Sequence, residues 1–180
     1  MRTNETYDRL AAIPHGVHKV ERSVRWASTC VGCRPKDQGG LCIRVYYTED
    51  EYAVGIARTE EAKNGFPGVQ HGGIVALYLD EVLWRQTKRE DFRVDAMTVE
   101  THLNYWAPLP ENTDIKVVAF PAEVDGRHYY VEGGILLPDG TIAATAKIHY
   151  ICLKVDSELS EEEQNRETNP VEVELDEIYF

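Results

Sequence analysis

The chain has 180 residues, of which 43% are hydrophobic, which is enough for one core in a single domain. Its 31 acidic residues outnumber its 19 lysines and arginines, and the formal net charge of −12 argues against nucleic-acid binding, which needs a basic surface. The first ten residues hold four charged side chains, and no later stretch is apolar enough to span a membrane. We therefore expect a cytoplasmic protein with neither a membrane nor a nucleic-acid partner.

The chain predicts a β-rich fold with one central helix. Residues 4–12 predict a short helix that ends before Pro14. Two strands follow at 41–47 and 51–58, and an apolar helix is expected over about 72–88. The later strands are expected at 96–106, 114–123, 127–137 and 141–153, with hairpin turns at Asp125-Gly126 and Asp139-Gly140. This order lacks the alternation of helices and strands that a doubly wound fold requires.

The strand at 96–106 alternates in polarity. One set of side chains is mainly apolar, namely Met97, Val99, Thr101, Leu103 and Tyr105. The other set is mainly polar, namely Thr98, Glu100, His102, Asn104 and Trp106. We therefore expect a half-buried strand with Thr98 and Thr101 on opposite faces.

We divide the chain into an N-terminal extension with the short helix at 1–27, a main domain at 28–155 and an acidic tail at 156–180. The tail is expected to be solvated because of its charge. A tail docked on the neighbouring subunit is the alternative, suggested by the apolar Ile178, Tyr179 and Phe180.

The most informative segment is 64–81, where a glycine-rich loop leads into the apolar helix. Gly72 and Gly73 follow His71 and allow the backbone to approach a ligand closely. A helix that begins there presents unpaired N–H groups and the positive end of its dipole, which suit a carbonyl oxygen or an oxyanion. Asp80 lies nine positions beyond His71. A carboxylate base and a helix-terminus electrophile suggest acyl transfer to water.

Asp80 is flanked on the helix by hydrocarbon and an indole ring, so burial should raise its pKa and suit it to activate water near neutral pH. The alternative is an acid satisfied by a backbone amide or an arginine. Glu81 precedes Arg85 by four residues, and we interpret this pair as a structural ion pair. His71 could act as a catalytic acid or base, or it could stabilise the turn before the helix. We assign it a positioning role.

Four cysteines are present, and in the cytoplasm they would be reduced. Cys30 and Cys33 would form half of a zinc site, but a full ligand set would have to recruit Cys42 or a histidine. We interpret the pair as packing of a turn and expect neither a metal nor another cofactor. Serine-hydrolase and nucleotide-binding motifs are also absent from the sequence.

The segment 65–81, with His-Gly-Gly and an acid nine positions beyond the histidine, resembles the signature of the hotdog-fold thioesterases, in particular the phenylacetate-pathway (PaaI-like) branch. The resemblance extends over about residues 28–154. It includes Cys30-Val-Gly-Cys33, then Gly40-Leu41, a strand that ends at Pro108, and the last two strands. Many relatives place an asparagine six positions before the histidine, where this chain has Gly65.

The resemblance implies an α+β hotdog fold, in which a curved antiparallel sheet wraps around one long helix. It also implies a homodimer, often a dimer of dimers, with sites between subunits and acyl-CoA thioesters as substrates. In such a site Asp80 would activate water or attack the thioester, while the N–H of Gly72 would polarise the carbonyl. To substrate binding we assign Gly73, Gln70, Asn64, Thr101 and Trp84.

CoA phosphates would need nearby cations, and the candidates are Arg34, Lys36, Arg85, Lys88, Arg89 and Arg127. The alternative function is a non-catalytic dimer that binds an acyl ligand, because a fold does not by itself specify an activity. The sequence does not rank short, medium, branched or aryl acyl groups.

Overall fold

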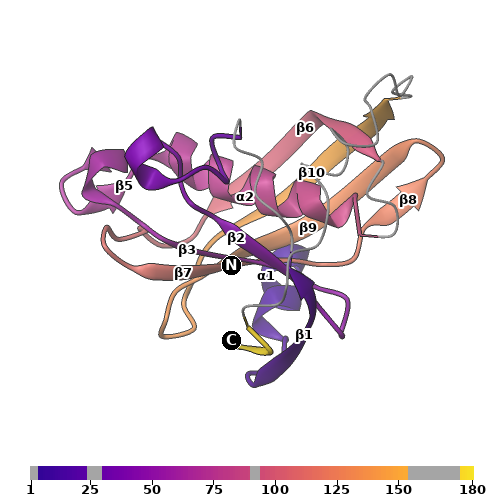
Figure 1. Ribbon diagram of the computed structural model, residues 1–180, viewed down its shortest axis with the longest axis horizontal. Coiled ribbons are helices and arrows are strands. Elements are labelled where there is room, and N and C mark those ends of the chain that lie inside the picture. The colour runs from indigo at the N-terminus through magenta and orange to yellow at the C-terminus, as the bar shows by residue number, and fades with distance from the viewer. Residues whose placement is uncertain (1–3, 24–29, 90–93, 154–174) are drawn as a thin grey trace.

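The computed structural model describes residues 4–23, 30–89, 94–153 and 175–180 (Figure 1). The α-helices are α1 (Glu5–Ala11) and α2 (Gly72–Gln86). The strands are β1 (Val17–Ser23), β2 (Arg44–Thr48), β3 (Ala53–Arg58), β4 (Asn64–Phe66), β5 (Val69–Gln70), β6 (Asp95–Tyr105), β7 (Asp114–Ala119), β8 (Glu123–Asp125), β9 (His128–Leu136), β10 (Ile142–Leu153) and β11 (Glu177–Tyr179). Across these described ranges, no helix is long and apolar enough to cross a bilayer.

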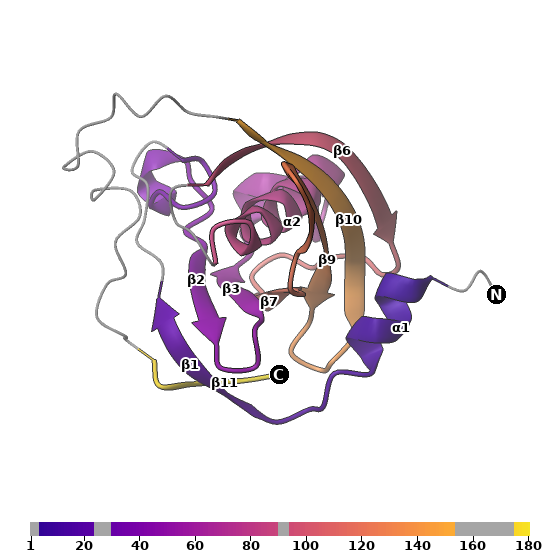
Figure 2. The same ribbon diagram turned by 90° about the vertical axis from the view of Figure 1, so that its right-hand side faces the viewer.

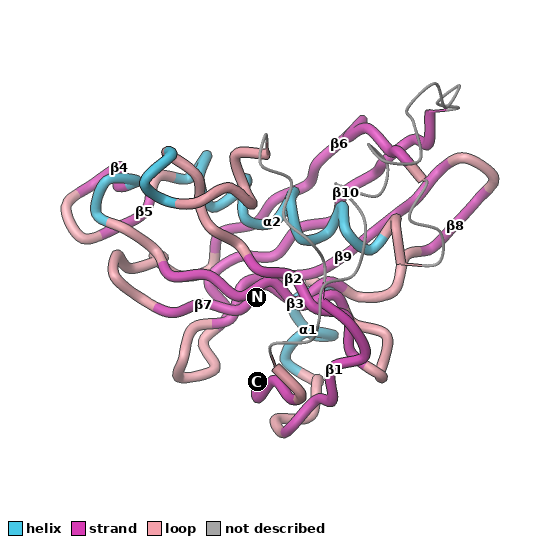
Figure 3. The backbone as a smooth tube through the Cα atoms, viewed as in Figure 1, coloured by secondary structure: helices cyan, strands magenta, loops and turns pink. Residues whose placement is uncertain are grey.

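One antiparallel sheet contains most of the strands, as the tube in Figure 3 makes clear. Its order is β11-β1-β2-β3-β7-β9-β10-β6, and β8 pairs with β9 beside this path. β10 pairs on one side with β9 and on the other with β6. β6 therefore lies at one end of the sheet, with its outer edge unpaired within the described protomer.

The sheet curves around α2, which Figure 2 shows nearly end-on. The helix is apolar around most of its circumference, so it needs protein on several sides. Tyr78, Leu79, Val82 and Leu83 have at most 1% of their surface exposed. They pack against inward-facing side chains of the long strands in one core cluster. Burial of this helix is the main apolar contact of the fold.

α2 lies very close to the sheet at β3. A Cβ atom built on Gly55 would lie only 2.3 Å from Cγ2 of Val82. This distance is far below van der Waals contact, so the helix can occupy this position only because residue 55 has no side chain.

The two ends of the chain cover the outer face of the sheet. α1 packs there, where Leu10 and Ile13 join a second apolar cluster with Phe180. β11 pairs with β1, and β1 pairs with β2. The sequence analysis treats these segments as an extension and a solvated tail. Instead, β1 is part of the main sheet, and Ile178 is 3% exposed, because both ends contribute apolar side chains to one cluster.

The strand expected at 114–123 is two strands. β7 ends at Ala119 and β8 begins at Glu123, with Pro121 between them. Proline has no N–H to donate to a sheet, so it interrupts the ladder. The expected strand at 41–47 begins only at Arg44, after Cys42 with a positive φ of 55°. In the acidic tail, Ser160 and Glu163 have the spacing of a capping box for a brief helix, but both lie outside the described residues.

Gly55→Ala should destabilise the fold because its methyl group would overlap Val82. We expect a loss of about 1–3 kcal/mol of unfolding free energy, which is typical of an overpacked core. Urea denaturation of the purified protein measures it. Gly16→Ala is the matched control, since its added Cβ would meet nothing within 4 Å. Equal urea midpoints for the two variants would contradict the close approach of helix and sheet.

Candidate active site

α2 begins at a histidine cap. His71 has an extended backbone conformation, and its Nδ1 accepts a hydrogen bond of 2.9 Å from the N–H of Gly73. The cap fixes the ring against the first turn and satisfies one of the free helical amides. Among the described residues, the N–H of Gly72 has no protein hydrogen-bond acceptor. This amide is therefore available to a ligand at the positive end of the helix dipole.

Tyr105 links the start of α2 to β6 through a hydrogen bond. Its hydroxyl donates a 2.8 Å hydrogen bond to the carbonyl oxygen of Gly72. A Cβ atom on Gly72 would lie 3.2 Å from this hydroxyl, so glycine permits the close contact. The sequence analysis did not single out Tyr105, because its contact joins segments 33 residues apart.

Asp80 lies beside the other end of β6. Its Oδ1 accepts a hydrogen bond of 2.9 Å from Oγ1 of Thr98. The hydroxyl of Tyr150, on β10, donates to the backbone carbonyl of Asp80 at 3.2 Å. The carboxylate is thus oriented by a strand hydroxyl. The Tyr150 hydroxyl also hydrogen-bonds the carboxyl group and, like Thr98, lowers its pKa.

A bulge in β6 brings Thr98 to Asp80. Tyr150 pairs with Thr98 and His149 pairs with Glu100, so Val99 is an extra residue in the strand. Farther along, Thr101 pairs with Ile148, which lies two residues from Tyr150 and on the same face. Thr98 and Thr101 therefore share the helix-facing side of the sheet, and the expectation of opposite faces is wrong. Bulges commonly redirect a side chain next to an active site.

Burial raises the pKa of the Asp80 carboxyl above its usual value. The hydrogen bond from Thr98 acts in the opposite direction, because it stabilises the ionised form, and the negative charge of Glu81 adds to the increase. The net increase in the pKa of Asp80 is the direction that the sequence predicts for an acid among apolar neighbours.

Glu81 faces away from Asp80, toward the turn that holds Cys30 and Cys33. Its Oε1 lies 2.6 Å from Nη2 of Arg85, which confirms the predicted ion pair. Both thiols also donate to this carboxylate, Cys30 at 2.9 Å and Cys33 at 3.0 Å. Although burial opposes it, the charge of Arg85 and these hydrogen bonds hold the pKa of Glu81 below its usual value. The sequence did not indicate that the cysteines and Glu81 meet.

Asn64 and Gln70 bind each other in the small β4–β5 hairpin. Nε2 of Gln70 donates to Oδ1 of Asn64 at 2.6 Å and to the carbonyl of Glu60 at 2.7 Å. Asn64 in turn donates to the carboxylate of Glu111. These contacts stabilise the loop before α2, and neither amide contacts Asp80.

Trp84 links the C-terminal end of α2 to the start of β6. Its Nε1 donates a 2.6 Å hydrogen bond to the carbonyl oxygen of Ala96. The ammonium of Lys88 lies 4.7 Å from the indole centroid and binds Asp95 at 2.8 Å. This arrangement gives Trp84 an anchoring contact close to Thr98, whereas its assignment to substrate binding stays a prediction.

Several of the cations considered for CoA already pair within the protomer. Lys88 binds Asp95, and Arg89 binds Glu21 at 2.7 Å. Arg85 is buried against Glu81. Binding a CoA phosphate at these side chains would require these ion pairs to rearrange.

A cavity of about 250 Å³ lies on the outer face of the sheet, away from Asp80. Residues of α1, the β9–β10 turn and Phe180 line it. None of the candidate catalytic or substrate-binding residues is among them, so this cavity is separate from the candidate active site.

A curved antiparallel sheet wrapped around one long helix is the hotdog fold, as expected. Residues 67–144 match the family model of the thioesterase superfamily. The matched residues include α2 with Asp80. No protein of curated function matches the chain.

Three solved structures illustrate the likeness. A crystal structure of a thioesterase superfamily protein is 20% identical, with a TM-score of 0.60, over 84% of this chain and 81% of that one. The E. coli PaaI protein from the phenylacetic acid degradation operon is 11% identical, with a TM-score of 0.57, over 63% and 80%. A hypothetical thioesterase from Streptococcus pneumoniae TIGR4, with coenzyme A, is 14% identical, with a TM-score of 0.53, over 62% and 85%.

The carboxyl of Asp80 should titrate above the range of an ordinary aspartate, and Thr98→Val should move its pKa still higher. The reason is that the variant removes a donor that stabilises the ionised form. Carbon-detected NMR of the side-chain carboxyl across a pH series measures both values. Thr113→Val, on a distant loop, serves as the control. An Asp80 pKa that falls in Thr98→Val would contradict this account of the site.

Proposed function

We propose that the protein is an acyl-CoA thioesterase of the PaaI-like type, which hydrolyses a thioester to a free acid and the CoA thiol. The observation that carries the proposal is the half-buried Asp80 carboxylate, held by Thr98 at the open edge of a hotdog fold whose residues 67–144 match the thioesterase superfamily. With its raised pKa, Asp80 suits a base that takes a proton from water, or a nucleophile that attacks the thioester. The free N–H of Gly72 suits the developing oxyanion.

These two groups cannot serve one carbonyl within a single protomer. Gly72 and Asp80 are eight residues apart in α2, which is about 12 Å along the helix axis. An attacking oxygen and an oxyanion donor must both lie about 3 Å from the same reacting group. We therefore infer that each site combines Gly72 of one protomer with Asp80 of its partner.

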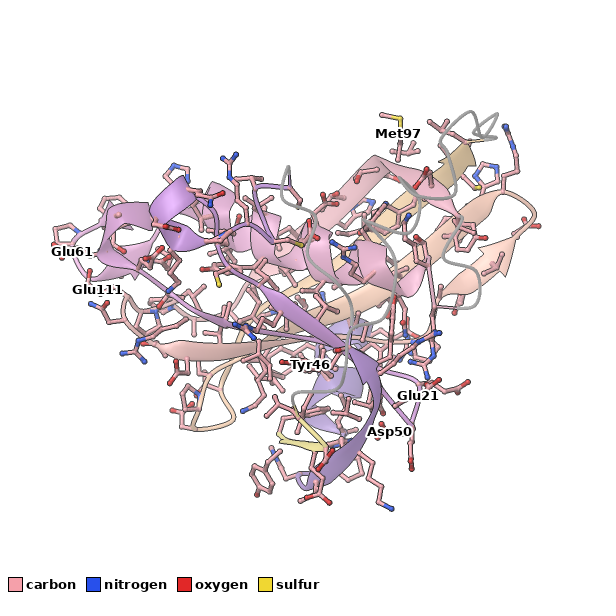
Figure 4. All side chains as sticks on the ribbon, in the orientation of Figure 1. Glu21, Tyr46, Asp50, Glu61, Met97 and Glu111 are labelled. Carbon is pink, nitrogen blue, oxygen red and sulfur yellow. The ribbon has the colours of Figure 1, made fainter. Side chains whose placement is uncertain are left out.

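The edge strand β6 provides the surface for this pairing. It is 11 residues long and ends the sheet, and apolar side chains are exposed along it. Met97, Val99 and Tyr105 are 59%, 56% and 55% exposed, and Figure 4 shows Met97 projecting from this edge. A long, apolar, unpaired edge strand favours pairing with another chain. Pairing with a second copy is the arrangement we propose.

Two-fold pairing of β6 would also align the catalytic groups. Thr98 contacts Asp80 near one end of the strand, and Tyr105 contacts Gly72 at the other end. Antiparallel pairing centred near Thr101 would bring the Asp80 end of one copy next to the Gly72 end of the other. Thr101 would then lie at the centre of the interface, within reach of both sites.

Asp80→Asn should abolish hydrolysis, because an amide can neither accept the proton of water nor attack the thioester. We expect a decrease in kcat of at least about 100-fold for loss of a general base. Free-thiol release from a panel of short-chain, medium-chain, branched and aryl acyl-CoAs measures the activity. Asp125→Asn, an exposed acid at the end of β8, is the control.

No release by the wild-type protein on any panel member would favour the alternative, a non-catalytic dimer that binds an acyl ligand. Equal release by wild type and Asp80→Asn would remove Asp80 from the mechanism. Size-exclusion chromatography of both proteins must give the same elution volume for either comparison to hold.

Mixing two inactive variants tests whether the site is shared. Gly72→Pro removes the proposed oxyanion donor at a helix position where proline is tolerated. Co-expressed with Asp80→Asn, it should form mixed dimers in which one site has both groups intact. Random pairing should restore about a quarter of the wild-type activity. Activity no higher than that of either variant alone would contradict a site shared between protomers.

A further inference from the structure

The side of α2 opposite Asp80 carries a second cluster of reactive groups. Sγ of Cys30 lies 2.9 Å from Oε2 of Glu81, and Sγ of Cys33 lies 3.0 Å from Oε1. One ligand atom from each of the three residues lies within 4.8 Å of those of the other two. Cys33 is 2% exposed and the side chain of Glu81 is 10% exposed, so the cluster lies inside the protein, whereas Cys30 is half-buried.

We propose that Cys30, Cys33 and Glu81 bind a zinc ion. Two thiolates and one carboxylate oxygen are ligands that zinc accepts, and two sulfur ligands favour zinc over magnesium or calcium. Zinc takes four ligands in a tetrahedral arrangement. The half-buried position of Cys30 leaves the fourth position on the solvent side, for a water molecule.

The charges of the cluster are balanced with and without the ion. Without it, the thiols are protonated and donate to Glu81, whose negative charge is matched by Arg85. Zinc binding would release the two thiol protons to solvent, and the two thiolates would neutralise the two charges of the ion. The net charge of the buried cluster is the same in both states, so the ion adds no unpaired charge to the interior.

Arg85 is placed to support the ligands in either state. Its Nη2 lies 2.6 Å from Oε1 of Glu81 and 2.9 Å from Sγ of Cys33. Residues that donate hydrogen bonds to metal ligands orient them and tune the site. The guanidinium contacts Cys33 and Glu81, and Cys30 remains available to turn toward the ion.

The local geometry needs a small adjustment. Sulfur and oxygen ligands of one zinc ion are about 3.6 Å apart, as follows from the bond lengths of a tetrahedral site. The observed separations of 2.9 and 3.0 Å would therefore have to widen by about 0.6–0.7 Å. Rotation of the half-buried Cys30 side chain would widen its separation from Glu81, and a small rotation of the Glu81 carboxylate would widen the separation from Cys33.

The zinc would join the turn at 30–33 to the helix that carries Asp80. Glu81 follows Asp80 directly, so the ion would fix this part of α2 from the side opposite the candidate active site. The inference does not depend on thioester hydrolysis, because its ligands are separate from the catalytic groups.

Metal binding by the reduced full-length protein tests the proposal. We expect one zinc per chain by elemental analysis after purification with a thiol-free reductant and dialysis against zinc. Cobalt as a substitute should give the absorption of a tetrahedral ion with thiolate ligands. The apparent affinity should rise about a hundredfold per pH unit while both thiols are protonated, because each ion displaces two protons.

Cys30→Ser and Cys33→Ser should each lose the zinc and the cobalt–thiolate band. Cys152→Ser, a free cysteine on β10 outside the cluster, should retain both. Arg85→Lys should weaken zinc binding by about 10-fold to 100-fold, the usual effect of removing a group that supports metal ligands. Circular dichroism shows whether each variant is folded, and Cys30→Ser, at the half-buried position, is the variant least prone to unfold.

Two results would overturn the proposal. One is a reduced wild-type protein that takes up no zinc and gives no cobalt–thiolate absorption; if that protein also forms a Cys30–Cys33 disulfide under mild oxidation, the turn would be assigned to redox chemistry instead. The other is zinc content in folded Cys30→Ser equal to that of wild type.

Discussion

The close packing of α2 against the concave face of the sheet is the contact on which the rest of this structure depends. The helix approaches β3 so closely that residue 55 must be glycine, and Val82 fills the space. Since Leu79, Val82 and Leu83 are fully buried, the rotation of the helix about its axis is fixed. That rotation decides where every polar side chain of α2 points.

Two adjacent acids show this consequence. Successive residues of an α-helix point about 100° apart, so Asp80 and Glu81 face different surroundings. Asp80 meets a strand hydroxyl in a largely apolar site, and its pKa rises. Glu81 meets Arg85 and two thiols, and its pKa falls. A carboxylate thus suits proton transfer on one side of the helix and, in the zinc site we propose, metal binding on the other.

The two ends of the sheet are used differently. At one end, the three-residue β11 closes the sheet, and the chain termini cover its outer face with an apolar cluster. At the other end, β6 is long and bears exposed apolar side chains. The same strand contacts both Asp80 and Gly72 through Thr98 and Tyr105. An interface at β6 would therefore cover apolar surface and assemble the catalytic groups in one step, which supports the shared site we propose.

The sequence by itself determined the central helix, most of the long strands and the likeness of 65–81 to a thioesterase signature, because these follow from local periodicity and spacing. It also determined the direction of the Asp80 pKa and the Glu81–Arg85 pair, which are helix-neighbour effects. Only the tertiary structure decided that Thr98 contacts Asp80, since this requires an extra residue at Val99. It alone joined Cys30 and Cys33 to Glu81, because contacts between residues about fifty positions apart depend on how the chain packs and leave no local pattern.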